Sequence, residues 1–321
     1  MLELARAWGA REKSRFFAET DALRVFHGPG EGTGIFSNLA IDRFGSHYWV
    51  TEWESGSSGP RNWKAALKDV ERFLRGKNAE SAVWLKRPEK GLPAEPEVLF
   101  GSPPRERFTV KEAGASYRIQ LLGARHPGLF LDHAPLRQWL RARCAGMNVL
   151  NTFAYTGSLS VAAGLGGATE VVTLDLSRPS VQWAEENWKA NALPDSSGRF
   201  IAGDVFEWLP RLKREGKRFD CVILDPPSFS RGKKGNFSTD RDLGKLHQLA
   251  MALLQPEGFL VSSINSAKIP FQRFETEIHE AARSAGFLFQ ILARMDLPES
   301  FPTALGDKEG RYLKGLILRR T

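Results

Sequence analysis

The sequence is poor in cysteine, with only Cys144 and Cys221 among its 321 residues. Two thiols without metal-like spacing exclude a disulfide framework and a zinc site, and they favour a reducing, intracellular compartment. No stretch approaches the ~20 apolar residues that span a bilayer, and the first residues lack the apolar core of a secretory signal. We therefore expect a cytoplasmic protein with no metal site and no membrane segment.

Acidic residues are outnumbered by basic ones. The chain has 45 Lys and Arg against 37 Asp and Glu, which gives a net charge of +8 and a pI of about 9.6. An excess of positive charge favours a nucleic-acid partner, because Lys and Arg displace the counterions condensed on phosphates. The alternative is a basic enzyme whose charge only maintains its solubility.

The first 124 residues lack long apolar runs, and short strand-like stretches alternate with glycine clusters. The residues around Gly45 and Gly114 each have the pattern of a hairpin, and residues 62–76 have helical spacing. We expect the glycine-rich residues 27–36 to form a flexible loop and the proline-rich residues 84–108 to form a surface linker. Residues 1–124 are thus predicted to form a small, β-rich α+β domain that has the potential to contact RNA.

Residues 125–321 alternate apolar strands with amphipathic helices, a pattern typical of a parallel sheet covered on both faces. In such sheets ligands bind beyond the carboxyl ends of the strands, near the topological switch point. The predicted strands are 148–154, 170–175, 199–203, 219–225, 259–265, 287–294 and 313–319, and the predicted helices are 178–192, 205–215, 239–255 and 271–285.

The turn after the first of these strands lacks the G-x-G-x-x-G spacing that a dinucleotide pyrophosphate requires. It has Thr156, Gly157 and Ser158, and the next glycine is Gly164. Free N–H groups at the helix start still favour an anion, such as the carboxylate of an amino-acid-like cofactor. An ordinary strand-to-helix turn is the alternative.

Acidic residues end the next two strands. Asp175 is suited to bind ribose hydroxyls, and Ser177 after it can cap a helix. Asp204 can accept a hydrogen bond from an adenine amino group, with Val205 and Phe206 flanking the ring. Both carboxylates have a simpler explanation as residues that stabilise helix N-termini.

The fourth strand ends in Asp225, Pro226 and Pro227, which predict a rigid loop because each proline fixes its own φ. Asp225 and the loop carbonyls can accept hydrogen bonds from a flat base, and Phe229 can stack on it. A solvated mobile loop is the alternative for the basic stretch that follows. We expect four basic residues there to contact phosphates: Arg231, Lys233, Lys234 and Arg241.

The run NTFAYTGSLSVAAGLGGATEVVTLDLSRPSVQWAEENWKAN, together with ILDPPSFSRGKKG, resembles the large-subunit ribosomal RNA methyltransferases, in particular the guanine-N7 domain of the bifunctional enzyme. The cytosine-C5 enzymes are more distant. HPGLFLDHAPLR is similar to the motif before the first strand of that family. The resemblance implies a Rossmann-like class I sheet of seven mostly parallel strands with the last antiparallel. It also implies that S-adenosyl-L-methionine is bound by Asp132, Arg137, Asn151, Phe153, Tyr155, Thr156, Gly157, Ser158, Asp175, Leu176, Ser177, Asp204, Val205 and Asp225.

A cysteine is missing after the fifth strand, where the family's cytosine-C5 enzymes carry their nucleophile. C5 methylation needs a thiolate that adds to the pyrimidine, whereas this chain has Asn265 and Ser266 at that position. Guanine N7 has a lone pair and needs only positioning and electrostatics. We therefore predict methylation of a base nitrogen in ribosomal RNA, with guanine N7 favoured and Asp225, Pro226, Pro227, Phe229 and Asn265 as the catalytic residues.

Other classes of function remain open. Asn265 has an alternative interpretation as a polar strand terminus, and cytosine C5 stays an alternative acceptor. A protein or small-molecule methyltransferase would keep the cofactor site without salt-sensitive RNA binding. The missing G-x-G-x-x-G disfavours a nicotinamide oxidoreductase, and intact Asp175, Asp204 and Asp225 disfavour an inactive RNA-binding relative.

Overall fold

The computed structural model describes residues 1–54, 63–88, 91, 95–232, 235–266, 268–305 and 312–321. The chain forms two compact units, one of Met1–His133 with Leu297–Gly310 and one of Ala134–Asp296 with Arg311–Thr321. The first division falls after His133 and not after residue 124. The segment Leu297–Gly310 belongs to the first unit although it lies near the end of the sequence.

The first unit has a five-stranded sheet in the order β1-β2-β3-β4-β5. The predicted hairpin at Gly45 is formed by β2 and β3, with Phe44 opposite His47, and the hairpin at Gly114 by β6 and β7. The predicted helix 62–76 is α4. The elements are α1 (Leu2–Glu12), α2 (Arg15–Glu19), β1 (Ala22–His27), β2 (Leu39–Phe44), β3 (His47–Trp53), α4 (Trp63–Arg75), β6 (Phe108–Glu112) and β7 (Ala115–Ile119).

Two predictions for the first unit were wrong. The expected linker 84–108 contains most of β4 (Ser81–Arg87) and all of β5 (Glu97–Gly101), which pair antiparallel in the sheet. Its prolines lie outside both strands, so they interrupt the segment without preventing strand pairing. The expected loop 27–36 contains α3 (Gly28–Glu31) and most of the 3-10 helix η1 (Gly34–Asn38).

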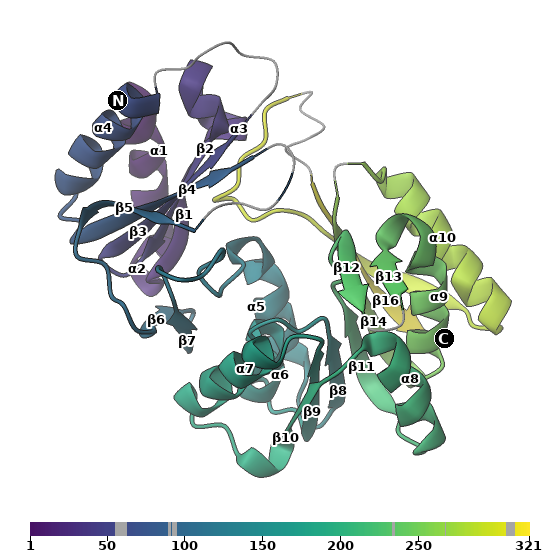
Figure 1. Cartoon of the computed structure of the whole chain (residues 1–321). Coiled ribbons are helices and arrows are strands. Elements are labelled where there is room, and N and C mark those ends of the chain that lie inside the picture. The colour runs from purple at the N-terminus through teal and green to yellow at the C-terminus, as the bar shows by residue number, and fades with distance from the viewer. Residues whose placement is uncertain (55–62, 89–90, 92–94, 233–234, 267, 306–311) are drawn as a thin grey trace. The chain divides into compact units, whose positions relative to one another are not determined.

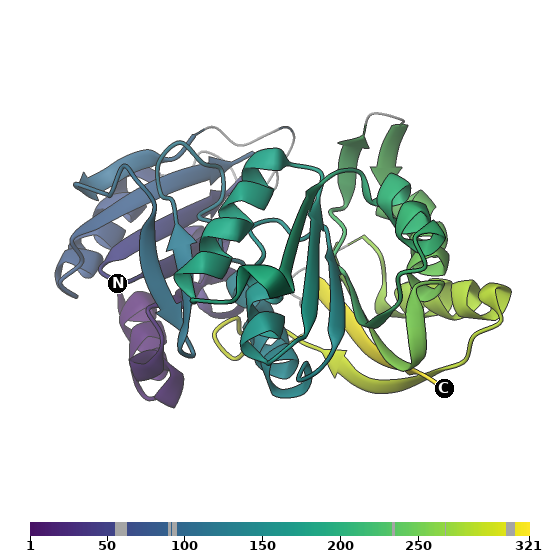
Figure 2. The ribbon, with the colours of Figure 1, turned by 90° about the horizontal axis from the view of Figure 1, so that it is seen from below.

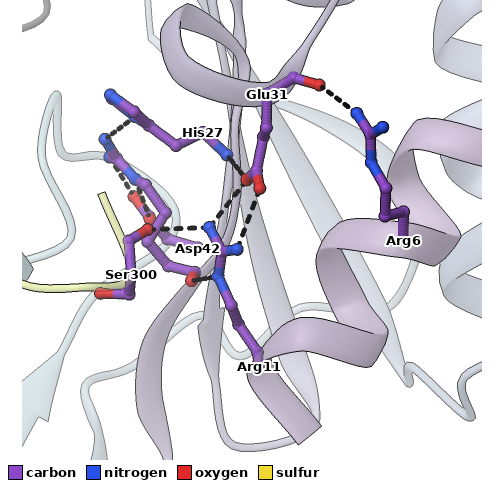
Figure 3. A network of polar contacts seen from close by, with 7 residues as sticks. Arg6, Arg11, His27, Glu31, Asp42 and Ser300 are labelled. Carbon is purple, nitrogen blue, oxygen red and sulfur yellow. Dashed lines mark hydrogen bonds and ion pairs between the residues drawn. The ribbon is translucent and has the colours of Figure 1, made fainter. Parts of the chain in front are cut away.

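A network of buried ion pairs joins distant parts of the first unit (Figure 3). The Arg11 guanidinium donates two hydrogen bonds to the Glu31 carboxylate, at 2.9 and 2.7 Å, and a third to the Ser300 carbonyl at 3.0 Å. Arg24 forms a similar two-bond pair with Asp42, at 2.7 and 2.9 Å. Because Ser300 belongs to Leu297–Gly310, this network fixes that segment to the first unit.

The second unit has a seven-stranded sheet in the order β10-β9-β8-β11-β14-β16-β15 (Figure 1). Strands β10, β9, β8, β11 and β14 run parallel, whereas β16 is antiparallel to both of its neighbours. The predicted Rossmann-like sheet of seven strands with the last antiparallel is therefore confirmed. The strands are β8 (Asn148–Thr152), β9 (Glu170–Asp175), β10 (Gly198–Ala202), β11 (Phe219–Leu224), β14 (Leu254–Asn265), β15 (Phe289–Met295) and β16 (Leu313–Arg320).

Helices cover both faces of this sheet (Figures 1 and 2). Alternate residues of each strand enter different cores: Val149 and Ile223 pack with the helices α5 to α7, whereas Leu150 and Leu224 pack with α8 to α10. This alternation follows from the two-residue repeat of a strand. The helices are α5 (Ala134–Arg143), α6 (Ser158–Leu165), α7 (Arg178–Ala190), α8 (Val205–Arg214), α9 (Thr239–Met251) and α10 (Phe271–Ala285).

The chain reverses its direction of winding between β8 and β11. It runs from β8 outward through β9 to β10, and then returns to place β11 on the other side of β8. The carboxyl ends of β8 and β11 thus form the topological switch point, where open α/β sheets bind their ligands. No helix among the described residues combines the length and the apolar character needed to cross a membrane.

Candidate active site

Polar side chains follow the parallel strands at one edge of the second unit's sheet. Asp175 ends β9, Asp204 follows β10, Asp225 follows β11 and Asn265 ends β14. Because these strands are parallel, their carboxyl ends lie at the same edge. Of the described residues, no group of three or more His, Cys, Asp or Glu is arranged to hold a metal ion.

The loop after β8 has an unusual backbone. Phe153, Tyr155 and Gly157 have φ angles of 52°, 49° and 71°, although residues with a Cβ rarely adopt positive φ. A Cβ at Gly157 would lie 2.7 Å from that of Ala184, so glycine is required here for space as well as for conformation. The sequence predicts this loop as a binding site, and strained backbone of this kind is concentrated at such sites.

Hydrogen bonds from other elements hold this loop in place. Asn187 of α7 donates through Nδ2 to the carbonyl of buried Thr156, at 2.8 Å. Gly157 is the N-cap of α6, and no cap hydrogen bond from a side chain is present there among the described residues. The N–H groups at the start of α6, from Ser158 onward, therefore stay available to an anion.

Asp175 connects this loop to the next helix. Its Oδ2 accepts a hydrogen bond from the Tyr155 amide and its Oδ1 accepts one from the Ser177 amide, both at 2.8 Å. Burial raises the pKa of Asp175, and the two backbone bonds oppose that shift. A carboxylate has about four acceptor sites, so Asp175 keeps the capacity to bind ribose hydroxyls. Leu176 beside it is 43% exposed, and Ser177 caps α7 through Ser180.

Asn151, which the resemblance implies as a cofactor-binding residue, is buried inside the second unit. Its side chain is 1% exposed and donates through Nδ2 to Ser160 of α6 at 2.9 Å. Thr173 of β9 donates to the same Ser160 oxygen at 2.8 Å. The buried Asn151 Oδ1 has no hydrogen-bond partner among the described residues. The side chain of Asn151 thus contacts α6 from within the sheet.

Asp204 acts as the N-cap of α8. Its Oδ1 accepts a hydrogen bond from the Phe206 amide at 2.8 Å, as the simpler explanation of this residue requires. The Val205 side chain is buried in the core, and that of Phe206 is partly buried. The second oxygen of Asp204 remains compatible with the adenine contact.

The two residues of the motif before β8 belong to different units. Asp132 is buried in the first unit, with Oδ1 3.1 Å from Nδ1 of His133. Arg137 is buried on α5 in the second unit. The motif therefore spans the point at which one unit ends and the next begins.

Asp225 is hydrogen-bonded to Ser263, a residue that the sequence analysis did not identify. Ser263 Oγ donates to Asp225 Oδ1 at 2.6 Å. The loop after Asp225 is also tied to β14, because Ser228 Oγ donates to the Asn265 carbonyl at 2.8 Å. Pro226 is buried and Pro227 exposed. A carboxylate, an exposed amide and a rigid loop are thus close together at the ends of β11 and β14.

Phe229 presents its ring to solvent. Its side chain is 52% exposed at the start of β12 (Phe229–Gly232), which pairs with β13 (Gly235–Ser238) as a hairpin (Figure 1). The backbone of Arg231 lies in this hairpin, whereas its side chain and all of Lys233 and Lys234 lie outside the described residues. Exposed Arg241 forms an ion pair with Asp242 at 2.8 Å, so a neighbouring carboxylate already balances its charge.

The two cysteines lie in the core of the second unit. Cys144 and Cys221 are both 0% exposed. The interaction with Cys144 and burial both raise the pKa of Cys221, which disfavours a reactive thiolate there.

Comparison with known proteins places this geometry in a family. The model of the S-adenosylmethionine-dependent methyltransferases matches residues 24–319. Proteins named "Ribosomal RNA large subunit methyltransferase I" from Aeromonas hydrophila and Shewanella amazonensis are 33% and 30% identical, over 88% and 98% of this chain and 71% and 79% of theirs. The solved structure of SMU.776 complexed with SAH is 27% identical with a TM-score of 0.87, over 99% of this chain and 81% of that one. The chain therefore belongs to the family of S-adenosylmethionine-dependent methyltransferases.

Proposed function

We propose that this methyltransferase modifies a base nitrogen of large-subunit ribosomal RNA, with guanine N7 as the favoured acceptor. The observation that carries the proposal is the group of side chains around Asp225: a carboxylate, the exposed ring of Phe229 and the exposed amide of Asn265. These are groups that bind a flat, polar base by hydrogen bonds and stacking. The names of the relatives and the net charge of +8 support RNA as the acceptor.

The side chains at the sheet edge fit S-adenosylmethionine. The uncapped start of α6 suits the carboxylate of its methionine part, while Asp175 and Asp204 keep acceptor sites for ribose hydroxyls and the adenine amino group. Exposed Leu176 offers an apolar surface to the adenine ring. When bound, the cofactor supplies an electrophilic methyl group. Phe153, Tyr155, Thr156 and Val205 would contribute mainly through their backbone and packing.

Nitrogen methylation suits the residues around Asp225. The N7 lone pair would form the new bond to the methyl carbon while the carbon–sulfur bond of the cofactor breaks, with S-adenosylhomocysteine as the leaving group and no loss of a proton from the base. The purine becomes positively charged, so a nearby carboxylate stabilises the product and the transition state that leads to it. Asp225 can also accept hydrogen bonds from the N–H groups of guanine, and Pro226 and Pro227 limit the movement of its loop. Cytosine C5 lacks support because both thiols are completely buried.

The test is transfer of a labelled methyl group from the cofactor to ribosomal RNA from cells that lack the gene, followed by nucleoside analysis by mass spectrometry. We expect labelled 7-methylguanosine. Labelled 5-methylcytidine would overturn the nitrogen acceptor, and label confined to protein or small molecules would overturn RNA as the substrate. Omission of the cofactor and use of RNA from cells that have the gene are the controls.

A further inference from the structure

Ser263 is the direct neighbour of Asp225 across two parallel strands. The register of β11 and β14 pairs Leu224 with Ser262, one position before each residue. Asp225 and Ser263 therefore come next to each other at the strand ends, and the Ser263 hydroxyl donates a 2.6 Å hydrogen bond to Asp225 Oδ1.

The Ser263 side chain is completely buried, whereas Asp225 is half-buried. Water therefore has little access to the Ser263 hydroxyl and does not compete for its hydrogen bond to Asp225. Hydrogen bonds to a carboxylate are about twice as strong as those between neutral groups. The sheet thus fixes one oxygen of Asp225 at the edge where ligands bind.

We infer that Ser263 is a positioning residue for methyl transfer, which holds the Asp225 carboxylate in the orientation in which it meets the acceptor base. The inference rests on the role proposed above for Asp225. Ser263 itself touches neither the base nor the cofactor. Its loss would remove the hydrogen bond that fixes this carboxylate oxygen, and a displacement of about 1 Å at a reacting centre can cost about 100-fold in rate.

Ser262 offers a matched control in the same strand. It is also 0% exposed, but its side chain is on the opposite face of the sheet, where its Oγ lies 2.8 Å from Nε2 of His247. Nδ1 of His247 lies 2.8 Å from the Leu243 carbonyl. Removal of the Ser262 hydroxyl therefore breaks a buried hydrogen bond of similar length without changing the surroundings of Asp225.

The experiment compares Ser263→Ala, Ser263→Thr and Ser262→Ala with the wild-type protein. The assay measures transfer of the labelled methyl group from the cofactor to an extract of cells that lack the gene. It gives the maximal rate and the half-saturating concentration of extract, and it does not depend on which molecule is the acceptor. Calorimetry gives the cofactor Kd, and thermal unfolding gives Tm. We expect S263A to lower the maximal rate about 10-fold or more, with cofactor Kd and half-saturating concentrations within about 3-fold. S263T should recover most of the rate, because it keeps a hydroxyl on the same carbon.

The control separates positioning from stability. S262A should lower Tm at least as much as S263A while its maximal rate stays within about 2-fold of the wild type. A rate of S263A within 2-fold of the wild type would overturn the inference, and so would an equal loss of rate in S262A. Ribonuclease treatment of the labelled extract tests the acceptor separately. If Asp225→Ala keeps full activity, the role proposed for Asp225 fails; if it loses activity while S263A does not, only the positioning role of Ser263 fails.

Discussion

The backbone amide of Tyr155 donates a 2.8 Å hydrogen bond to the carboxylate of Asp175, although the two residues are 20 positions apart. The other oxygen of Asp175 accepts the Ser177 amide, so the carboxylate ties the loop after β8 to the start of α7. Tyr155 has a positive φ of 49°, which costs free energy. Asp175 thus stabilises the strained loop that is proposed to contact the cofactor, in addition to its own proposed contact with ribose.

Asp175→Asn should weaken cofactor binding about 10-fold or more. An amide keeps the shape of the carboxylate, but its nitrogen cannot accept the hydrogen bond of either backbone amide or of a ribose hydroxyl. Isothermal titration calorimetry with the cofactor measures the change. Exposed Asp195 in the same unit provides the control, because Asp195→Asn removes an equal charge without a contact to the loop. Equal affinity in D175N and wild type would contradict the role of Asp175.

Asp225→Ala should abolish methyl transfer while the cofactor Kd stays within about 3-fold of the wild type. Asp225 is expected to act on the acceptor base, whereas we expect the strained loop and Asp175 to provide most of the cofactor contacts. Single-turnover transfer and calorimetry on the same preparation measure the two effects. An inactive variant that also fails to bind the cofactor would contradict this division of roles.

Cys144→Ala and Cys221→Ala should each retain methyl transfer. Both side chains are buried, so their loss is expected to lower the free energy of unfolding by about 1–2 kcal/mol without a change at the site. Transfer assays and denaturing electrophoresis of the wild-type protein with RNA check this. A covalent protein–RNA adduct that disappears in one of the two variants would restore the C5 mechanism.

The sheet of the second unit could be predicted because its strands are buried on both faces. Runs such as Val171–Leu174 and Cys221–Leu224 are apolar at almost every position, and polar residues stand directly after them. The strands of the first unit were harder to predict from the sequence. The segment around β4 and β5 is rich in proline, and pairing with β3 overrides that composition.

For most of the residues that hold the site in place, the role could not be predicted from the sequence. Ser160, Asn187 and Ser263 are common polar residues without a motif, and their partners lie 9, 31 and 38 positions away. The packing of α6 and α7 brings Ser160 and Asn187 to their partners, and the register of β11 and β14 brings Ser263 to Asp225, only after the chain folds. In hindsight, the consecutive serines in the apolar fifth strand, Ser262 and Ser263, were a signal, because a buried hydroxyl needs a partner.

Acid should destabilise the protein through three histidines, of which His27 and His247 are buried and His126 is partly buried. Burial and the nearby charges of Arg24 and Arg11 lower the pKa of His27 to about 3. Burial and the charge of Arg87 lower the pKa of His126 to about 3. Burial lowers the pKa of His247 to about 4. Each histidine is neutral in the folded protein down to those values, whereas in the unfolded chain it gains a proton below about pH 6.5. Their stabilising contribution is therefore complete above pH 6.5 and falls as the pH decreases.

The expected slope is up to about 1.4 kcal/mol per pH unit for each histidine below pH 6.5. Urea unfolding at pH 7.5, 6.5, 5.5 and 5.0 measures it before most carboxylates titrate. His247→Gln should reduce the slope by about one third, whereas His279→Gln, a change on the exposed face of α10, should leave it as in the wild type. A free energy of unfolding that is constant from pH 7.5 to 5.0 would refute this account.

Glu31→Gln should lower the free energy of unfolding by about 3 kcal/mol or more, because it leaves the Arg11 guanidinium buried without its counter-charge. The Arg11 and Glu31 side chains are 9% and 13% exposed, and Arg11 also bonds the Ser300 carbonyl. Asp69→Asn is the matched control. It breaks an exposed pair with Arg72 on α4, whose side chains are 38% and 71% exposed, and such pairs contribute about 1 kcal/mol or less. Urea unfolding of both variants measures the difference. An equal loss of unfolding free energy in the two variants would mean that burial does not strengthen the Arg11–Glu31 pair. The network would then not anchor the segment around Ser300.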